Sequence, residues 1–488
     1  MHTIIEEQGK VTKQIIRYMH MRHMFIKVWN RRKSLFCIFA ILSCMMVGMP
    51  TLGAKKIKAK AEAVAQEPVS DNTKGFYKDL FVDGGINVSS RDYLPSARFM
   101  QLQWESFLCT AQKGRDTTTY SAIDTLMQRQ FIVGNPLDEN GALLFPDGQP
   151  RFRMVFMNGG AAARHGRSLG EDGRNRYREY VRNGGSYVGD CAGMFLGSRA
   201  VKGDSALKYL DAYLGIWPGL TISTGLETSQ TNLTIEENAP LLRFYDFGGD
   251  HQVDSVYHNG GGFAVTDTLW PEGTEILARY EVTGRDLKLK RDIQGLPAIW
   301  AYKADDHTGR VLLCGSHPEF VGSGEKLDLM LSMVKYAMEG TVAPRLKGVL
   351  LNGQKREMYR KTRDNDPDFT AIGDRQYHHF TVDVPHDADT LRIILKPKPG
   401  TVNFDLFLLA QPNEYAYLET ATYKHAGAGC DKTLIIPNPP AGRLFVSVFC
   451  NTTVESTQTP YGTQYSGRLD VLNGVPYSIQ AEWNLKGK

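Results

Sequence analysis

An apolar run that passes through Gly-x-Cys-x-Gly into residues that favour a helix is the feature that most constrains this chain. The run covers residues 184–196, and Cys191 lies near its centre. A nucleophile on a sharp strand-to-helix turn needs small neighbours two residues to either side, because other chain segments pass it closely. Gly189 and Gly193 meet that need. The pattern predicts a strand, a tight turn that presents Cys191, and a helix that starts at the turn.

The predicted helix would influence the chemistry of the thiol. Unpaired N–H groups and the dipole at a helix N-terminus favour a thiolate. The N–H of Ala192 is placed to stabilise a developing oxyanion. Asp190 acts in the opposite sense, since a nearby carboxylate disfavours a thiolate. A cysteine also needs a base for acyl transfer, so this interpretation requires a histidine elsewhere.

A second motif supplies that histidine. The apolar residues 311–314 lead into Gly-Ser-His-Pro-Glu, which places His317 and Glu319 two residues apart. Alternate residues beyond a strand end can lie on one side, so Glu319 could orient the imidazole of His317 while this ring faces Cys191. Each motif alone has a structural interpretation, as a buried cysteine or as a chance His-Pro-Glu sequence. Both motifs in this order, each after a β-type run, favour a catalytic pair.

Strands and helices are predicted to alternate around these motifs. Besides the strands before Cys191 and His317, the pattern predicts strands at residues 80–85 and 152–157. It predicts helices over residues 94–109, 171–183 and 325–339. Such an alternation indicates a parallel sheet with crossover helices, with functional loops at the carboxyl ends of the strands.

These motifs resemble the Cys–His–Glu triad of class I glutamine amidotransferase-like proteins. The resemblance is closest to the domain found at the N-terminus of biotin–protein ligases, and it runs over residues 76–340. The segments that carry it are residues 184–193, 257–263, 277–280 and 315–319.

The resemblance implies a flavodoxin-like parallel sheet and a catalytic domain over residues 76–342. It also implies that the glycine turn after residues 152–157 supplies a second oxyanion N–H, from Gly160 or Gly159. A plain glycine turn is the alternative interpretation of these two residues.

The segment Asn259-Gly260-Gly261-Gly262 has two interpretations. Consecutive glycines allow close approach of the backbone to a ligand or to a neighbouring strand. The resemblance implies that Asn259, Gly260 and Gly261 border a pocket with Asp190, whereas the pattern alone favours a hairpin. No cofactor is indicated, and His251 and His258 lack a Cys or carboxylate at metal-ligand spacing, so no metal site is predicted.

Residues 343–488 change to short strands separated by Pro and Gly turns, which predicts an all-β sandwich. This region resembles the prepeptidase-type modules appended to secreted bacterial hydrolases. Such modules imply attachment, targeting or substrate presentation, with a cell-surface glycan or protein as a possible partner.

The N-terminus carries the basic excess of the chain. Residues 1–60 hold 12 Lys and Arg against 2 Glu, and the remainder holds 45 basic and 51 acidic residues, so no nucleic-acid partner is indicated. Basic residues precede the apolar run 35–49, and small residues lead to Ala54, as in a secretory signal peptide over residues 1–54. The basic stretch before the run is long for a signal peptide, which points to a start at Met21 or Met24. Residues 55–75 are predicted to be a linker.

Two alternatives to a cleaved signal peptide remain. An uncleaved membrane anchor would need about 20 apolar residues, more than this run provides. A lipoprotein anchor at Cys44 fits less well, because the apolar run continues past it. The sequence therefore predicts an exported protein.

Five cysteines follow residue 54, and an odd number leaves one free thiol. Cys430 and Cys450 could form a disulfide or could be isolated core cysteines, whereas Cys314 and its apolar strand predict buried packing.

The sequence predicts an exported cysteine hydrolase of peptide or γ-glutamyl amide bonds. Export separates the chain from the synthase partners of ammonia-channelling amidotransferases, so hydrolysis is favoured over transfer. The alternative is a catalytically idle domain that binds a ligand, a glycan or a protein at the cell surface. A biotin–protein ligase is not indicated, because the chain has no identifiable ligase domain.

Overall fold

The computed structural model describes residues 71–83, 94–107, 131–281, 292–361, 366–459 and 462–487. They belong to a compact unit that runs from Glu67 to Lys488. The predicted signal peptide, most of the predicted linker, and Cys109 lie outside the described residues. Within the described ranges, no helix is long and apolar enough to cross a membrane.

The largest sheet has 11 strands in the order β22-β23-β2-β1-β3-β4-β13-β12-β11-β8-β9. In chain order its strands are β1 (Lys78–Asp83), β2 (Trp104–Phe107), β3 (Phe152–Met157), β4 (Ser186–Asp190), β8 (Ser229–Ile235), β9 (Gln252–His258), β11 (Thr274–Glu281), β12 (Pro297–Tyr302), β13 (Val311–Cys314), β22 (Val454–Thr459) and β23 (Gly462–Gly467).

The strands of this sheet are parallel only in its centre. Neighbours in the series β2-β1-β3-β4-β13 pair in parallel, and β12, β11, β8 and β9 continue the sheet with antiparallel pairs. Parallel pairing needs a long crossover, usually a helix, whereas antiparallel strands can follow one another through short connections. The observed sheet is therefore mixed, and it departs from the clean flavodoxin-like parallel sheet that the sequence predicted.

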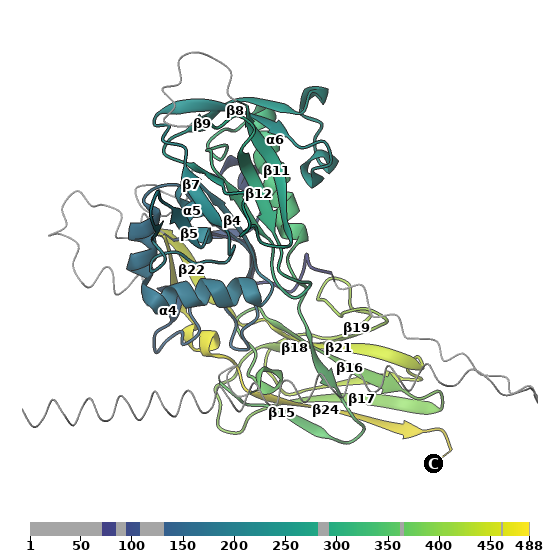
Figure 1. Cartoon of the computed structure of the whole chain (residues 1–488). Coiled ribbons are helices and arrows are strands. Elements are labelled where there is room, and N and C mark those ends of the chain that lie inside the picture. The colour runs from purple at the N-terminus through teal and green to yellow at the C-terminus, as the bar shows by residue number, and fades with distance from the viewer. Residues whose placement is uncertain are drawn as a thin grey trace, which may run out of the picture. The chain divides into compact units, whose positions relative to one another are not determined.

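The main helices cover the two faces of this sheet. They are α4 (Ala162–Arg182), α5 (Ala192–Gly197) and α6 (Gly324–Glu339). Alternate residues of β1 point to opposite faces, so Leu80 and Val82 pack in the core that contains α6, and Phe81 packs in the core that contains α4 and α5. The central strands thus lie between two helical layers (Figure 1).

One predicted helix is confirmed, and another is correct only in its first half. The helix predicted over residues 325–339 is α6, almost residue for residue. The helix predicted over residues 94–109 is wrong in its second half, because α2 (Pro95–Phe99) ends early and β2 follows it. Gln101 has a positive φ of 54°, which breaks the helix, and Trp104–Phe107 then pairs with β1.

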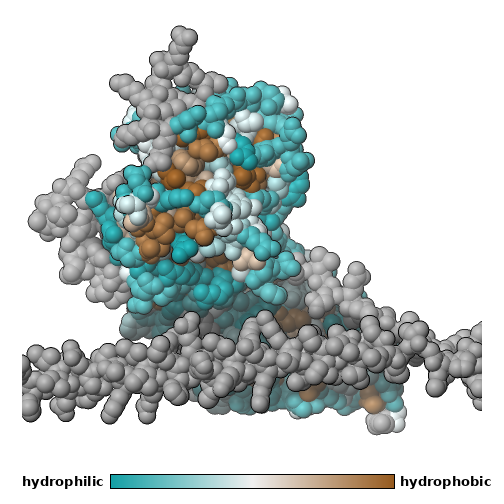
Figure 2. All heavy atoms as spheres, viewed as in Figure 1, coloured by the Kyte–Doolittle hydropathy of each residue, from teal (hydrophilic) through white to brown (hydrophobic). Residues whose placement is uncertain are grey.

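A smaller sheet lies beside the nucleophile region. Its strand order is β10-β7-β5-β6. Its strands are β5 (Ala200–Lys202), β6 (Leu207–Lys208), β7 (Leu220–Ser223) and β10 (Gly262–Ala264). β9 pairs with β8 and β10 pairs with β7, so the hairpin predicted around residues 259–262 is wrong. The turn instead carries the chain from one sheet to another. In Figure 2, brown apolar surface gathers in the region where Figure 1 labels β5 and β7.

The C-terminal region is rich in strands, as predicted. One sheet has the order β14-β16-β21-β18-β19 and the other β15-β24-β17-β20. Their strands are β14 (Leu346–Val349), β15 (Lys355–Met358), β16 (Tyr377–Val384), β17 (Ala388–Pro397), β18 (Leu406–Pro412), β19 (Tyr423–His425), β20 (Lys432–Pro437), β21 (Gly442–Cys450) and β24 (Tyr477–Leu485). Of the short 3-10 helices, η3 (Pro240–Arg243) and η4 (Phe247–Gly249) precede this region, and η6 (Pro367–Phe369) and η7 (Leu469–Asn473) lie within it. Both sheets contribute to one apolar core, which gives a β-sandwich. Cys430 and Cys450 are both free and buried in this region.

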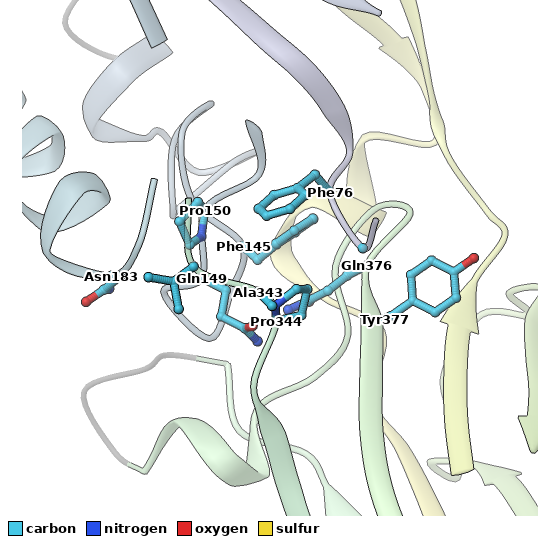
Figure 3. A pocket seen from close by; sticks show the side chains of 11 residues that line it. Phe76, Phe145, Gln149, Pro150, Asn183, Ala343, Pro344, Gln376 and Tyr377 are labelled. Atoms are coloured by element: carbon cyan, nitrogen blue, oxygen red, sulfur yellow. The ribbon is translucent and has the colours of Figure 1, made fainter. Parts of the chain in front are cut away.

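The predicted boundary at residue 343 is crossed by several contacts. The hairpin β22–β23 joins the 11-stranded sheet, where Gly462 pairs with Phe107 of β2. A buried ion pair joins Lys347 to Asp147 at 2.6 Å. Figure 3 shows a pocket in this region, and its lining includes none of the predicted catalytic residues. Residues on both sides of the predicted boundary are therefore in direct contact.

Candidate active site

Cys191 occupies a strained turn between β4 and α5. Its φ is 46° and its ψ is −101°, a conformation that L-residues rarely adopt. A Cβ atom on Gly189 would lie 2.5 Å from the carbonyl carbon of Gly193, and one on Gly193 would lie 2.1 Å from the carbonyl oxygen of Met157. Both glycines are thus required by close backbone contacts.

His317 and Glu319 follow β13, the parallel neighbour of β4. Cys314 of β13 lies opposite Asp190 of β4 in the register, so the two motifs emerge at the same edge of the sheet. Nδ1 of His317 lies 2.8 Å from Oε1 of Glu319. Since a carboxylate accepts, Nδ1 carries the proton, which leaves the other ring nitrogen for Cys191.

The side chain of Cys191 acts on the imidazole of His317. Burial lowers the pKa of His317, but interactions with Cys191 and Glu319 outweigh it and raise this pKa to about 11. The ring therefore holds two protons at neutral pH and can give one to a leaving group. Sγ of Cys191 also lies 3.4 Å from the carbonyl oxygen of Asn259.

The glycine turn after β3 lies against this pair. A Cβ atom on Gly159 would lie 2.6 Å from Cε1 of His317 and 3.7 Å from Cβ of Cys191. Gly160 has a φ of 129°. Ala192 is the first residue of α5, so its N–H has no acceptor within the helix. Of the predicted oxyanion donors, Ala192 thus directly follows Cys191, and Gly159 lies against the His317 ring.

The predicted pocket residues lie at different depths. Asn259 is exposed beside Cys191, and its side-chain Oδ1 accepts a hydrogen bond from the Thr228 N–H at 3.1 Å. Gly260 has a φ of 71°. A Cβ atom on Gly261 would lie 1.8 Å from the carbonyl oxygen of Gly315, so this glycine is required by a close backbone contact.

Asp190 lies beneath the site and is fully buried, so it does not line an open pocket. Burial and the neighbouring Glu319 raise the pKa of Asp190 well above its ordinary value. A neutral Asp190 does not oppose a thiolate. The expectation that Asp190 disfavours the Cys191 thiolate therefore depends on whether Asp190 carries a proton, and it stays a prediction.

Several residues of the site were not singled out from the sequence. Tyr257 and Phe320 flank the His317 ring, with centroids 5.6 and 5.9 Å from it, and they are 39% and 38% exposed. The backbone carbonyl oxygen of Tyr257 also accepts a hydrogen bond from the backbone N–H of His317, at 2.8 Å. Tyr257 lies two residues before Asn259, and Phe320 directly follows Glu319. This closeness to predicted site residues was the signal by which the sequence could have identified them.

His258 is a buried neighbour of the Cys–His pair. Its ring nitrogens lie 2.7 Å from the Thr224 hydroxyl and 3.0 Å from the Ser316 hydroxyl. Burial and the neighbouring His317 lower the pKa of His258 to about 4, so it is neutral at pH 7. In the described part of the chain, His, Cys, Asp and Glu side chains form no cluster suited to a metal ion.

Comparison with known families agrees with the resemblance seen in the sequence. Residues 119–341 match the family described as Biotin-protein ligase, N terminal. All four segments that carry the resemblance lie within this match to the biotin–protein ligase N-terminal family, so the predicted relationship is confirmed over that range. No curated protein matches the chain.

Three solved structures show limited likeness. A glutamine amidotransferase is 18% identical, with a TM-score of 0.26, and the alignment covers 38% of this chain and 80% of that one. A thua-like protein from Bacteroides uniformis is 10% identical, with a TM-score of 0.31 and coverage of 54% and 92%. A β-galactosidase from Rahnella sp. R3 is 12% identical, with a TM-score of 0.23 and coverage of 64% and 36%.

Proposed function

We propose that the chain is a hydrolase of amide bonds that uses Cys191 as nucleophile, His317 as acid and base, and Glu319 as the residue that orients His317. The observation that carries this proposal is the strained turn at Cys191 beside a histidine whose Nδ1 is held by a buried carboxylate. A nucleophile, a base and an orienting group in this order form the arrangement used by cysteine hydrolases.

The proposed reaction has two halves. Sγ of Cys191, with its proton held by His317, attacks the amide carbonyl carbon, and the oxygen takes the electron pair of the C=O bond. The C–N bond then breaks, His317 gives a proton to the departing nitrogen, and a thioester remains on Cys191. Water attacks this thioester, gives a proton to His317, and releases a carboxylic acid and the free cysteine. The N–H groups of Ala192 and of Gly159 or Gly160 would hold the oxyanion in both halves.

Exposed aromatic rings beside His317 support a peptide-type substrate over a small polar amide. Tyr257 and Phe320 offer apolar surface at the rim, and such surface binds apolar side chains by removing them from water. A peptide or a γ-glutamyl amide remains the proposed class. Export, and contact of the C-terminal sandwich with a cell-surface glycan or protein, are further parts of the proposal.

A second candidate function is a binding domain without catalysis. The observation that favours it is burial, since Cys191 is 5% exposed and His317 is 7% exposed. A substrate carbonyl would have to reach both groups through a narrow opening.

Trapping of a thioester separates the two candidates. The protein is mixed with a panel of peptide and γ-glutamyl p-nitroanilides and examined by intact-mass spectrometry, with Cys191→Ala as the control. The proposal expects release of nitroaniline and a mass increase equal to the acyl group on the wild type only. Hydrolysis that persists in Cys191→Ala, or no turnover of any panel member, would contradict it.

A further inference from the structure

Asp190 and Glu319 form a pair of buried carboxyl groups beneath the Cys–His pair. Both side chains are fully buried. Asp190 is the last residue of β4, and its partner in the parallel ladder is Cys314, which begins the segment that leads to Glu319. The charge of Glu319 acts on Asp190, so the two carboxyl groups share one buried site.

The burial of both carboxyl groups in one site requires a proton on one of them. Among the described residues, no donor reaches either oxygen of Asp190 or Oε2 of Glu319. Two ionised carboxylates have only acceptors, so they repel each other and cannot form a hydrogen bond. Like charges in one buried site force one of the pair to keep its proton.

The surrounding groups indicate which carboxyl group is protonated. Glu319 accepts the Nδ1 proton of His317 through Oε1, which stabilises its charged form. The titratable groups that act on Asp190 are Glu319, His317 and Cys191, and Asp190 in turn acts on the buried Cys314 and Tyr187. His317 is the only cation in this set, and it is bound to Glu319 instead.

We infer that Asp190 is a neutral carboxylic acid that donates its proton to Oε2 of Glu319 and thereby fixes the carboxylate that orients His317. Both oxygens of Glu319 then have a donor, one from Asp190 and one from His317. The Glu319 carboxylate cannot rotate without losing one of them. Asp190 is thus a positioning residue that acts through Glu319.

The shared proton is independent of the proposed function, whereas the positioning role rests on it. The first test is therefore ¹³C NMR of the full chain labelled at the Asp carboxyl carbon, with Asp190→Asn used to assign the Asp190 signal. We expect the chemical shift of a protonated carboxyl that stays unchanged through neutral pH. A signal that titrates near the ordinary Asp pKa of about 3.9 would overturn the inference.

The second test measures the rate at which iodoacetamide alkylates Cys191 as a function of pH. Asn can donate its amide N–H to Oε2 of Glu319, whereas Val leaves that oxygen without a donor. We expect Asp190→Asn to keep the wild-type rate within about twofold, and Asp190→Val to lower it about tenfold with a shifted pH profile, as expected for a lost charge-assisted hydrogen bond. Equal rates and profiles for both variants would overturn the positioning role, even if the NMR signal shows a proton.

The two tests also separate this inference from the proposed function. An unreactive Cys191 in the wild type would contradict the hydrolase proposal and the positioning role, and it would leave the NMR result on Asp190 intact. If Asp190→Val does not fold, the NMR titration of the wild type still decides whether Asp190 is protonated.

Discussion

At the residue scale, single atoms decide whether the Cys–His pair can align. Gly159 has no room for a side chain, because an added Cβ would lie 2.6 Å from Cε1 of His317. We expect Gly159→Ala to displace this ring and to slow alkylation of Cys191 by at least about tenfold, since misplacement by about 1 Å can cost more than that. Gly322→Ala is the matched control, because among the described residues its Cβ would meet only Pro95 Cβ, at 3.8 Å. Equal rates for both variants would show that the Gly159 contact does not hold His317.

At the element scale, the turn from β4 into α5 is fixed by its contacts with β3. Alanine in place of a helical glycine normally stabilises by about 1 kcal/mol. A Cβ atom on Gly193 would instead lie 2.1 Å from the Met157 carbonyl oxygen, which is rigid backbone. We therefore expect Gly193→Ala to lower the free energy of unfolding by about 1–3 kcal/mol, the usual cost of overpacking. Denaturant unfolding measures it, and a variant as stable as the wild type would contradict this account of the turn.

The local patterns predicted several elements well. β3 and α6 have the predicted bounds because a buried apolar run and a helical period determine them within one stretch of sequence. The short strand β2 depends on pairing with β1 and with the distant strand β23, which no local pattern encodes. The order of the two motifs predicted that Cys191, His317 and Glu319 lie together. The approach of Asp190 to Glu319 could not be predicted in this way, because it depends on the register of β4 against β13.

At the scale of the whole molecule, buried charges join the sandwich region to the sheet region. Burial alone would raise the pKa of Asp147, but the ion pair with Lys347 outweighs it and holds this pKa below its ordinary value. The stability from this carboxylate is present above the unfolded pKa of about 3.9 and is lost as the pH falls toward the lower folded value. Lys347→Met leaves a buried charge unpaired, so we expect a loss of about 3–5 kcal/mol at neutral pH.

The double variant Lys347→Met with Asp147→Asn is the control for that prediction. It removes both charges, and we expect it to recover most of the lost stability, because an uncharged pair carries no unpaired buried ion. Denaturant unfolding at neutral and acidic pH measures both variants. A double variant as unstable as Lys347→Met would show that the loss comes from packing and not from charge.

The central claim is that His317 and Glu319 activate Cys191. Its most direct test is alkylation by iodoacetamide, followed for each cysteine by peptide mass spectrometry from mildly acidic to mildly alkaline pH. We predict that Cys191 reacts rapidly near neutral pH while buried Cys314 stays unmodified, and that His317→Ala lowers the Cys191 rate about tenfold or more. A Cys191 that reacts as an ordinary thiol with a pKa of about 8.5, at the same rate in both proteins, would contradict the claim.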